Sequence, residues 1–531
     1  MYTLIIASLI STLALGAEVR KLTREDIEWG DPSTTVTSPG GHVGHRIDNT
    51  YSLSSPYVDV RAYGASASAT AVVNNAAFAS AIAAVSDFGV LFIPPGTYRG
   101  HLIVRRNNIT IMAYGATIKA EDNVAGAWTV LEIGDTASGN SATAYDNVNV
   151  LGITLDGNKD GTTDPGNDLN GWGIATTKIS HGNFRDIKAI NCWNGGAGTF
   201  INSNYNRWSD IYVYNCGFGA QNEPGFDVNS SKYNSFKGIV VEACNYGFRL
   251  LDNCHGNEAD VIIYNPTILG VVYNNQAVNS SKANIIRATV VNGGSSGAMT
   301  VGANCSASQI YLATDNVTGY GLHIQGPTDI AADNQSNGNY YNVTTKGSGL
   351  QSVKVYSDRN RIDVSSNQDG RSGAQGDNFA VDVHGDNNVI NAIVEDTTTW
   401  QVRGVVFRSG ADGNRLESLR YINTANPYSD SGSSNYFNTG GWGDNLASSS
   451  TISPKWWNGP IFYLTGTDNV TTITADSANG KQITLISTDN VTIVNGSNIK
   501  LGSNWVSGGD NATLTLISNG TNWYEIGRRV N

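Results

Sequence analysis

From about residue 100 onward, short stretches of alternating apolar and polar residues recur between turns rich in glycine and asparagine. A glycine opens one short strand of each unit, at steps of roughly 25 residues. These marker glycines are Gly173, Gly198, Gly225, Gly247, Gly270, Gly297 and Gly321. Repeats of this length without a helix in each unit predict a β-solenoid, whose coils bury their inward residues by stacking on their neighbours. The pattern blurs after residue 330, where apparent insertions interrupt it.

Three of the five cysteines keep the same spacing as the coils. Cys192, Cys216 and Cys244 each close a short strand that begins with isoleucine. Their recurrence once per unit predicts one interior column of small apolar side chains. We therefore expect buried thiols here rather than disulfides, which the odd number of cysteines also disfavours.

Upstream of the repeats, three segments predict a cap on the solenoid. They are a strand and turn at 58–65 (VDVRAYGA), an alanine-rich helix over 75–85 capped by Asn74, and a strand with a Pro-Pro turn at 90–100 (VLFIPPGTYRG). This order resembles the N-terminal cap of the pectate-lyase-like superfamily. The resemblance covers about 58–425 and implies a right-handed parallel β-helix. Because that superfamily includes lyases, hydrolases, epimerases and non-catalytic adhesins, the resemblance leaves the activity open.

The rest of the chain predicts three further segments around the β-helix, which we place at 56–450. Residues 1–17 form the only long apolar run and predict a signal peptide, the alternatives being a buried or virion-attached segment or a misassigned start. The run is too short for a comfortable transmembrane helix. Residues 18–55 are a charged segment followed by a linker. Residues 451–531 alternate Thr, Ile and Val between turns, which predicts an antiparallel, sandwich-like β-domain.

The predicted fold is therefore all-β: a right-handed parallel β-helix with an N-terminal helical cap and a C-terminal antiparallel β-domain. That last domain resembles the β-domains that follow β-helices in phage tailspikes and related bacterial surface proteins. The segment that carries this resemblance reads GSN-x-K-L…GTNWYE. The resemblance implies a homotrimer.

The composition excludes a disordered chain and gives no support for a nucleic-acid partner. The 531 residues include 60 glycines and only 15% charged residues, but 40% are hydrophobic, which excludes a disordered chain. The formal net charge is −12, and no basic run is long enough to suggest a nucleic-acid partner. Because charge is scarce, the few places where charged residues gather are candidate functional sites.

The densest gathering of charge lies on two neighbouring coils. After each marker glycine, the first and third residues are apolar or small, so the second should point out of the coil. Down the stack this outward column is predicted to be Ala175, Phe200, Asp227, Arg249, Val272, Met299 and His323. Asp227 and Arg249 are then neighbours in space. Glu223 precedes them, and Asp252 and His255 follow.

Two carboxylates beside an arginine suggest chemistry on sugars. Glu223 and Asp227 would serve as general acid and as base or nucleophile in glycosidic cleavage. Arg249 would orient a substrate carboxylate or lower a carboxyl pKa. In a lyase, Arg249, Lys232 or His255 would instead remove a proton next to a uronate carboxylate. The alternative is an Asp–Arg ladder pair with no role in catalysis.

Aromatic residues in the flanking loops suggest a groove for a glycan. Trp172, Trp193, Phe218 and Tyr246 are candidates for substrate binding together with Lys232, because aromatic faces stack on sugar rings. Loop aromatics also pack onto coils as lids, and the sequence leaves both interpretations open.

A turn after residue 155 matches part of a calcium-binding loop. Asp156, Asn158, Asp160 and Asp164 follow the pattern D-x-N-x-D-G, whose oxygens suit a hard cation. Asn167 stands where the bidentate glutamate would be. Calcium is therefore a possible ligand, with a plain polar turn insertion as the alternative, and no cofactor is required.

Together these features predict a polysaccharide-degrading enzyme, either a glycoside hydrolase or a polysaccharide lyase, that acts on an extracellular glycan. Its predicted location is secreted or on a virion surface. The alternative is a non-catalytic glycan-binding or virion attachment protein that uses the same rod.

Overall fold

The computed structural model describes most of the chain after residue 54. The described ranges are 55–122, 128–135, 142–166, 170–219, 223–274, 281–302, 304–325, 336–367, 379–395, 403–422, 428–437, 445–454, 459–474 and 479–530. The predicted signal peptide, 1–17, lies outside these residues, as does all but the last residue of the segment predicted at 18–55.

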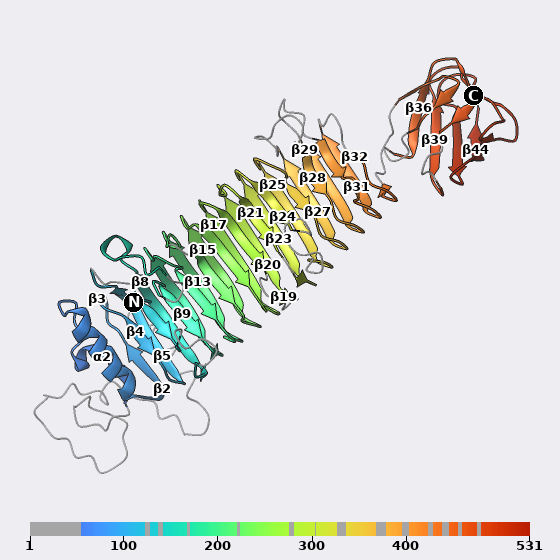
Figure 1. The fold of residues 1–531 in the computed structure, drawn as a ribbon. Coiled ribbons are helices and arrows are strands. Elements are labelled where there is room, and N and C mark those ends of the chain that lie inside the picture. The colour runs from blue at the N-terminus through green and yellow to red at the C-terminus, as the bar shows by residue number, and fades with distance from the viewer. Residues whose placement is uncertain are drawn as a thin grey trace, which may run out of the picture. The chain divides into compact units, whose positions relative to one another are not determined.

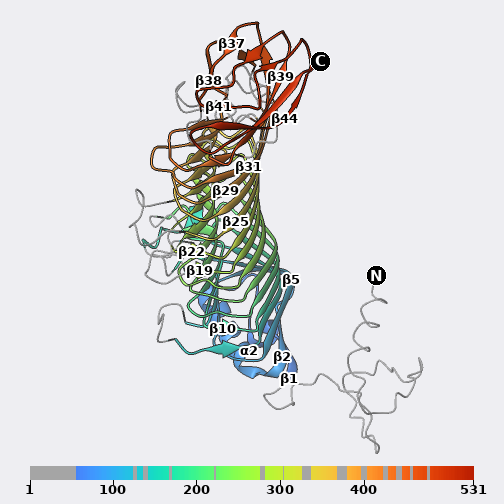
Figure 2. The ribbon, with the colours of Figure 1, turned by 90° about the vertical axis from the view of Figure 1, so that its right-hand side faces the viewer.

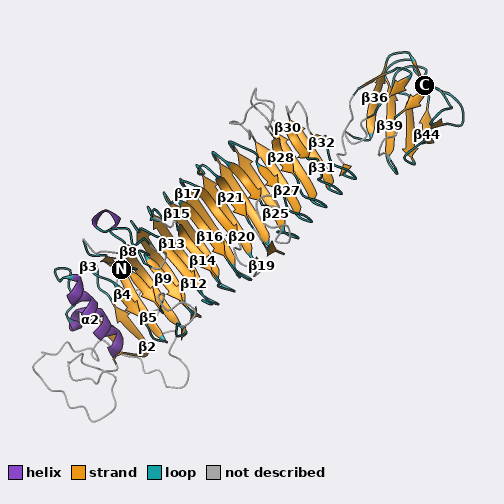
Figure 3. Cartoon of the chain, viewed as in Figure 1, coloured by secondary structure: helices purple, strands orange, loops and turns teal. Residues whose placement is uncertain are grey.

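A parallel β-helix of about 14 turns carries most of the described residues (Figures 1 and 3). Each coil contributes one strand to a 16-stranded sheet and one to a 13-stranded sheet. Within both sheets, neighbouring strands pair in parallel and come from successive coils. This confirms the predicted right-handed parallel β-helix.

The 13-stranded sheet contains β4 (Leu102–Val104), β6 (Leu131–Ile133), β9 (Ile174–Thr177), β12 (Ala197–Phe200), β14 (Pro224–Asn229), β16 (Tyr246–Leu251), β18 (Leu269–Asn274), β21 (Gly297–Val301), β24 (Tyr320–Ile324), β26 (Val353–Val355), β28 (Phe379–Val383), β30 (Arg403–Phe407) and β32 (Tyr428–Asp430). The 16-stranded sheet contains β1 (Ser55–Asp59), β2 (Val85–Phe92), β3 (Gly96–Arg99), β5 (Ile109–Lys119), β8 (Val148–Asp156), β11 (Asn183–Ile190), β13 (Arg207–Tyr214), β15 (Ser235–Glu242), β17 (Glu258–Tyr264), β20 (Ile285–Val291), β23 (Gln309–Asp315), β25 (Tyr340–Lys346), β27 (Arg361–Asn367), β29 (Val389–Glu395), β31 (Arg415–Ile422) and β33 (Tyr436–Phe437). Short strands β19 (Ser281–Lys282) and β22 (Cys305–Ser306) pair on a third side of the coils (Figure 2).

A ladder of buried asparagines joins the coils at the turn before the 16-stranded sheet. In each link, a side-chain oxygen accepts from the backbone N–H of the residue one coil earlier, at 2.8–3.0 Å. Ser308 replaces asparagine in one coil. The ladder contains Asn206, Asn234, Asn257, Asn284, Ser308, Asn339, Asn360, Asn388, Asn414 and Asn435. It satisfies buried backbone donors that would otherwise cost stability at each turn.

The interior of the coils is apolar and includes the cysteine column. All five cysteines are buried free thiols, including the three for which the sequence predicted this. The N–H of Cys192 points at the sulfur of Cys216, and the N–H of Cys216 points at that of Cys244, each at 3.4 Å. Burial raises the pKa of the Cys216 and Cys244 thiols well above the usual value. These thiols therefore pack as small apolar groups and are not reactive nucleophiles.

Helix α2 (Ala71–Ala84) covers the first coils and forms the predicted N-terminal cap. Phe78 packs edge-on against Tyr98 of the PPGTY turn. The helix starts earlier than predicted, because Thr70 is its N-cap and accepts from the N–H of Val73. Asn74 is instead buried, where it accepts from Ser66 and donates to the carbonyl of Arg99. The cap shields the end of the coil stack from edge pairing.

The outward column of the 13-stranded sheet follows the prediction at most positions. The observed column is Ala175, Gly198, Asp227, Arg249, Val272, Thr300 and His323. Phe200 and Met299 are not part of it. Gly196, not Gly198, is the counterpart of Gly225, and Gly297 lies one position before its counterparts. Met299 therefore faces the core and is fully buried.

The C-terminal residues form a separate hydrophobic core, which includes Phe462, Trp505 and Trp523. Its main sheet has the order β34 (Leu446–Ala447), β36 (Ile461–Thr465), β39 (Gln482–Ser487), β43 (Thr513–Ser518), β44 (Trp523–Arg529) and β41 (Ile499–Lys500). The pairs β39–β43 and β43–β44 are antiparallel, as predicted for this domain, and the outer pairs are parallel. Among the described residues, we find no helix with the length and apolarity needed to cross a membrane.

Candidate functional site

Asp227 on β14 and Arg249 on β16 lie directly opposite each other on neighbouring coils. Their strand neighbours Phe226, Val228, Phe248 and Leu250 are buried in the core. The two charged side chains therefore lie on the outer side of the sheet, as the alternation predicted.

One arginine binds two carboxylates at this position. The Nε of Arg249 donates to Oδ1 of Asp227 at 2.8 Å, and its Nη2 donates to Oδ2 at 2.7 Å. The same Nη2 also donates to Oε2 of Glu223. Burial opposes the charge of Arg249, but Asp227 and Glu223 outweigh burial and raise the pKa of the guanidinium above its usual value. We call these three residues the Asp227 cluster.

The Asp227 cluster is largely withdrawn from water. The side chains of Asp227, Glu223 and Arg249 are 1%, 10% and 18% exposed. Asp227 is therefore almost completely buried, and Glu223 and Arg249 keep a small exposed fraction. Within the described residues, Nη1 of Arg249 donates no hydrogen bond.

Local sequence brings Glu223 over the sheet. A Cβ on Gly225 would lie 2.4 Å from Val241 and 3.0 Å from the sulfur of Cys244, so only glycine fits at the start of this strand. Gly217 has a φ of 85°, and a Cβ there would meet the carbonyl of Glu223. These two close approaches press the Glu223 backbone against the coils and aim its side chain at Arg249.

The other predicted catalytic residues lie beyond the opposite ends of the same strands. Lys232 follows β14, and Asp252 and His255 follow β16, whereas Glu223 precedes β14. Nε2 of His255 lies 2.8 Å from Oδ1 of Asn253. Burial, with the nearby Lys232 and Lys282, lowers the pKa of His255 below its usual value. The structure thus groups Lys232 and His255 with each other and not with the Asp227 cluster.

The four predicted aromatic residues divide into two kinds. Trp172 is buried and packs edge-on against Phe200 with 5.0 Å between ring centroids, so it acts as a lid on the coil. Trp193, Phe218 and Tyr246 are only partly buried. These three stand before or at the start of β12, β14 and β16, the same edge of the sheet as Glu223. Trp193 donates from Nε1 to Thr162 at 3.0 Å, and Nζ of Lys159 lies 4.3 Å from the Phe218 ring centroid.

Several side-chain oxygens of the predicted calcium loop accept hydrogen bonds from the protein itself. Oδ1 of Asp156 accepts from the N–H of Asn158 at 2.9 Å, and Nδ2 of Asn158 donates to Asp122 at 2.8 Å. Asp164 accepts from the N–H of Gly166, and Asp160 is exposed in a short 3₁₀ turn. Among the described residues, no three His, Cys, Asp or Glu side chains converge as metal ligands. Calcium at this loop remains a prediction.

Sequence reasoning missed a second aspartate on the same column. Asp382 on β28 lies two coils beyond His323, and Arg408 binds it in the same two-bond manner. The signal was present as VDV followed by an arginine about one coil later, which parallels GFDV and Arg249. It was overlooked because no marker glycine opens that strand.

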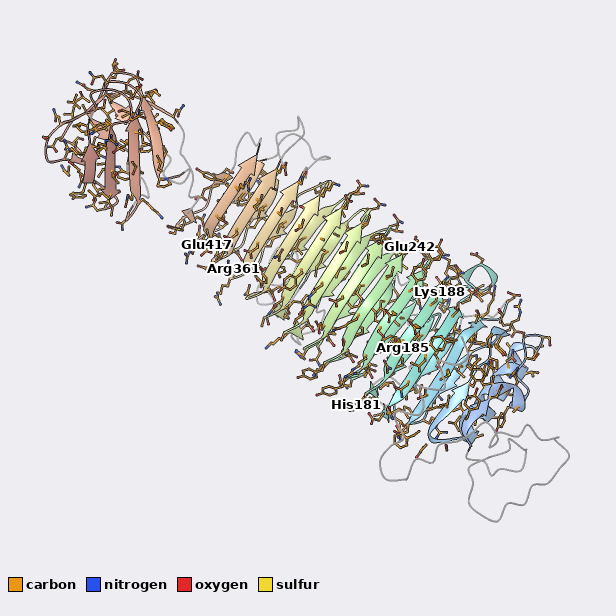
Figure 4. All side chains as sticks on the ribbon, turned by 180° about the vertical axis from the view of Figure 1, so that it is seen from behind. His181, Arg185, Lys188, Glu242, Arg361 and Glu417 are labelled. Atoms are coloured by element: carbon orange, nitrogen blue, oxygen red, sulfur yellow. The ribbon has the colours of Figure 1, made fainter. Side chains whose placement is uncertain are left out.

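The 16-stranded sheet carries its charges differently (Figure 4). Arg361 lies 3.7 Å from Glu417, and their side chains are 53% and 30% exposed. Such open pairs contribute about 0–1 kcal/mol. The buried charges of the 13-stranded sheet are therefore the more specific feature, since desolvated charges need closely matched partners.

Comparisons with known proteins find similarity to this chain only among solved structures. No protein-family model matches the sequence, and no curated protein matches it. Among solved structures, the chain is similar to the N-terminal fragment of bacteriophage Phi29 gene product 12, at 14% identity over 83% of this chain and 84% of that chain, with a TM-score of 0.49. It is also similar to the A-module of mannuronan C-5 epimerase AlgE6 from Azotobacter vinelandii, at 15% identity over 72% and 98%, with a TM-score of 0.47.

A third similar structure is the family 28 exopolygalacturonase of Yersinia enterocolitica, at 9% identity over 72% of this chain and 78% of that chain, with a TM-score of 0.44. At such identities the similarity concerns the fold alone. The decisive observations are the stacked parallel coils and the helical cap of this chain itself. The chain has the right-handed parallel β-helix fold that its sequence predicted.

Proposed function

We propose that this protein is an enzyme that cleaves an extracellular polysaccharide at the Asp227 cluster. The observation that carries the proposal is the largely buried arginine with two carboxylates on the outer side of the coils. The partly buried Trp193 and Tyr246 support it, because they lie at the same sheet edge and aromatic rings stack on sugar rings, whereas the ring of Phe218 is covered by Lys159.

Each member of the cluster has a separate role in this proposal. Glu223 is the catalytic carboxylate and acts as the base. In a hydrolase it takes a proton from the attacking water, and in a lyase it takes the proton next to the uronate carboxylate. In both, the glycosidic C–O bond breaks and the leaving oxygen takes a proton from solvent. Arg249 donates from Nη1 to a sugar oxygen and holds the ring against Glu223. Asp227 is a positioning residue, since its side chain is 1% exposed and both its oxygens bind Arg249.

The test compares Glu223→Gln with a matched control on the other sheet, Glu242→Gln. Turnover should fall about 100-fold or more in Glu223→Gln, because the amide cannot transfer the proton, and Glu242→Gln should keep wild-type turnover. Absorbance at 235 nm separates a lyase, which leaves an unsaturated product end, from a hydrolase. Equal turnover in both variants would exclude Glu223 as the catalytic carboxylate.

A non-catalytic glycan-binding or virion attachment protein is the second candidate. The observation in its favour is that Glu223, Asp227 and Arg249 already satisfy one another. A polysaccharide that binds to the protein and keeps its full chain length during incubation would favour this function over cleavage.

We also propose that the protein is a secreted or virion-surface homotrimer. The support is the resemblance of residues 451–531 to tailspike C-terminal domains and the apolar run at 1–17. Light scattering on the full chain tests the assembly, and a monomeric mass of 56.3 kDa would contradict it.

A further inference from the structure

The outward column that contains Asp227 continues into a second cluster. His323 on β24, Lys354 on β26 and Asp382 on β28 lie in register on three successive coils. Lys354 is five coils from Asp227, which corresponds to ~24 Å at the usual strand spacing. The two places are therefore separate sites on one sheet.

Four rings run along the coils around Lys354. Tyr320 lies against His323 at 5.1 Å between centroids, and His323 lies against Tyr356 at 5.9 Å. Tyr356 then stacks on His384 at 4.1 Å. All four side chains are partly exposed. They form a continuous aromatic surface on the outer side of the sheet.

Lys354 lies between the two tyrosines of this surface. Its Nζ is 5.3 Å from the Tyr320 ring centroid and 5.0 Å from that of Tyr356. Burial opposes its charge, but hydrogen bonding to Tyr356 and the nearby Tyr320 outweigh burial and raise the pKa of Lys354. Among the described residues, no carboxylate pairs with it. The surface therefore presents a partly buried, uncompensated cation.

The neighbouring carboxylate is already occupied. Arg408 binds Asp382 through Nε at 2.7 Å and Nη2 at 3.1 Å, and Nε2 of His384 lies 3.3 Å from Oδ2 of Asp382. The side chain of Asp382 is only 2% exposed. It anchors His384 and Arg408 and leaves the charge of Lys354 for a ligand. With His384 neutral, Lys354, Asp382 and Arg408 carry a formal charge of +1.

We propose that Tyr320, His323, Lys354, Tyr356 and His384, here called the Lys354 patch, bind a sugar ring that carries an anionic group. The rings contact the apolar face of the sugar, and Lys354 binds its carboxylate or sulfate. The chain is thereby a binder of acidic glycans at a site distinct from the Asp227 cluster. This proposal shares with the proposed function only the glycan ligand, because it requires binding and not cleavage.

The test measures binding by calorimetry with the full chain and three sets of oligosaccharides: uronate oligomers, sulfated oligomers and their neutral analogues. The wild-type protein should prefer one of the anionic sets, which identifies the group that Lys354 binds. Lys354→Met should weaken that binding at least ~10-fold, as expected for loss of a charge-assisted hydrogen bond. Lys354→Arg should retain most of the affinity.

Two controls keep the result specific. Lys346→Met removes an exposed lysine of the other sheet and should bind as wild type does. Glu223→Gln is assayed only for cleavage, by product formation, so that loss of cleavage and loss of binding are distinguished. The proposal is overturned if the wild-type protein binds no anionic oligosaccharide, if it binds the neutral analogues equally well, or if Lys354→Met binds as tightly as wild type while its circular dichroism is unchanged.

Discussion

The Asp227 cluster and the Lys354 patch show how one coil position can serve two chemistries. In both, an aspartate on the same outward column is bound through two hydrogen bonds by an arginine of the next coil. At the first, a second carboxylate, Glu223, leaves a formal charge of −1. At the second, Lys354 and His384 stand in its place. The Asp–Arg pair is thus common to both regions. Glu223 at the first, and Lys354 at the second, set the sign of the net charge that a ligand would meet.

The largest expected effect is on stability, and it separates the two aspartates. Asp227→Ala should destabilise the fold by about 3–5 kcal/mol, because it leaves Arg249 buried with one partner. Asp382→Ala should cost less, since Arg408 is 33% exposed and can turn toward water. Urea unfolding followed by circular dichroism measures both, with the exposed Asp315→Ala as control. A change below about 1 kcal/mol for Asp227→Ala would contradict a buried anchor.

The second effect separates catalysis from binding on an acidic polysaccharide. Glu223→Gln should lower kcat about 100-fold with little change in KM. Lys354→Met should raise KM and leave kcat unchanged, because the Lys354 patch lies ~24 Å from the reacting atoms. Steady-state kinetics on both variants measure kcat and KM and so separate an effect on catalysis from an effect on binding. If both substitutions changed the same parameter, the two regions would form one site.

A third effect concerns the asparagine ladder, which supports both regions alike. Asn257→Ala removes the acceptor of the buried Asn234 N–H and should cost about 1–3 kcal/mol. The control is Asn342→Ala, because Asn342 is exposed on β25 of the 16-stranded sheet. Unfolding in urea should show the loss for Asn257→Ala alone. Equal stability of the two variants would show that the ladder does not stabilise the coils.

The smallest effect is a pH dependence at the second region. Burial raises the pKa of Asp382, but His384 and Arg408 outweigh it and leave the pKa below its usual value. The ionised carboxylate therefore adds stability above about pH 4, which is lost as the pH falls through the lowered pKa. The stability difference between wild type and Asp382→Asn should shrink below pH 4. A difference independent of pH from 2 to 7 would contradict this assignment.

Sequence reasoning was most successful where the repeat is regular. It predicted the pairing of Asp227 with Arg249, because alternation and coil spacing fix both positions. It placed Phe200 and Met299 wrongly in the same column, because two nearby glycines, Gly196 and Gly198, compete as the marker, and Gly297 is offset by one. A glycine marks a coil but does not fix its register.

Features that depend on contacts between distant segments could not be predicted. The alternation predicted that the Asp227 side chain points outward, but it could not predict that this side chain is buried. Its burial depends on Arg249 and on the close packing of Gly217 against Glu223. The Lys354 patch could not be predicted because the repeat blurs after residue 330. The buried asparagines looked like ordinary turn residues, since their role depends on the coil stacked above each one.

The measurement that most directly tests the central claim is the chain length of a panel of polysaccharides after incubation with the protein, with product ends identified by mass spectrometry. The account predicts that the wild-type protein shortens at least one polysaccharide and that Glu223→Gln shortens the same polysaccharide about 100-fold more slowly. Shortening at the same rate by both proteins, or binding without shortening by the wild type, would contradict cleavage at the Asp227 cluster.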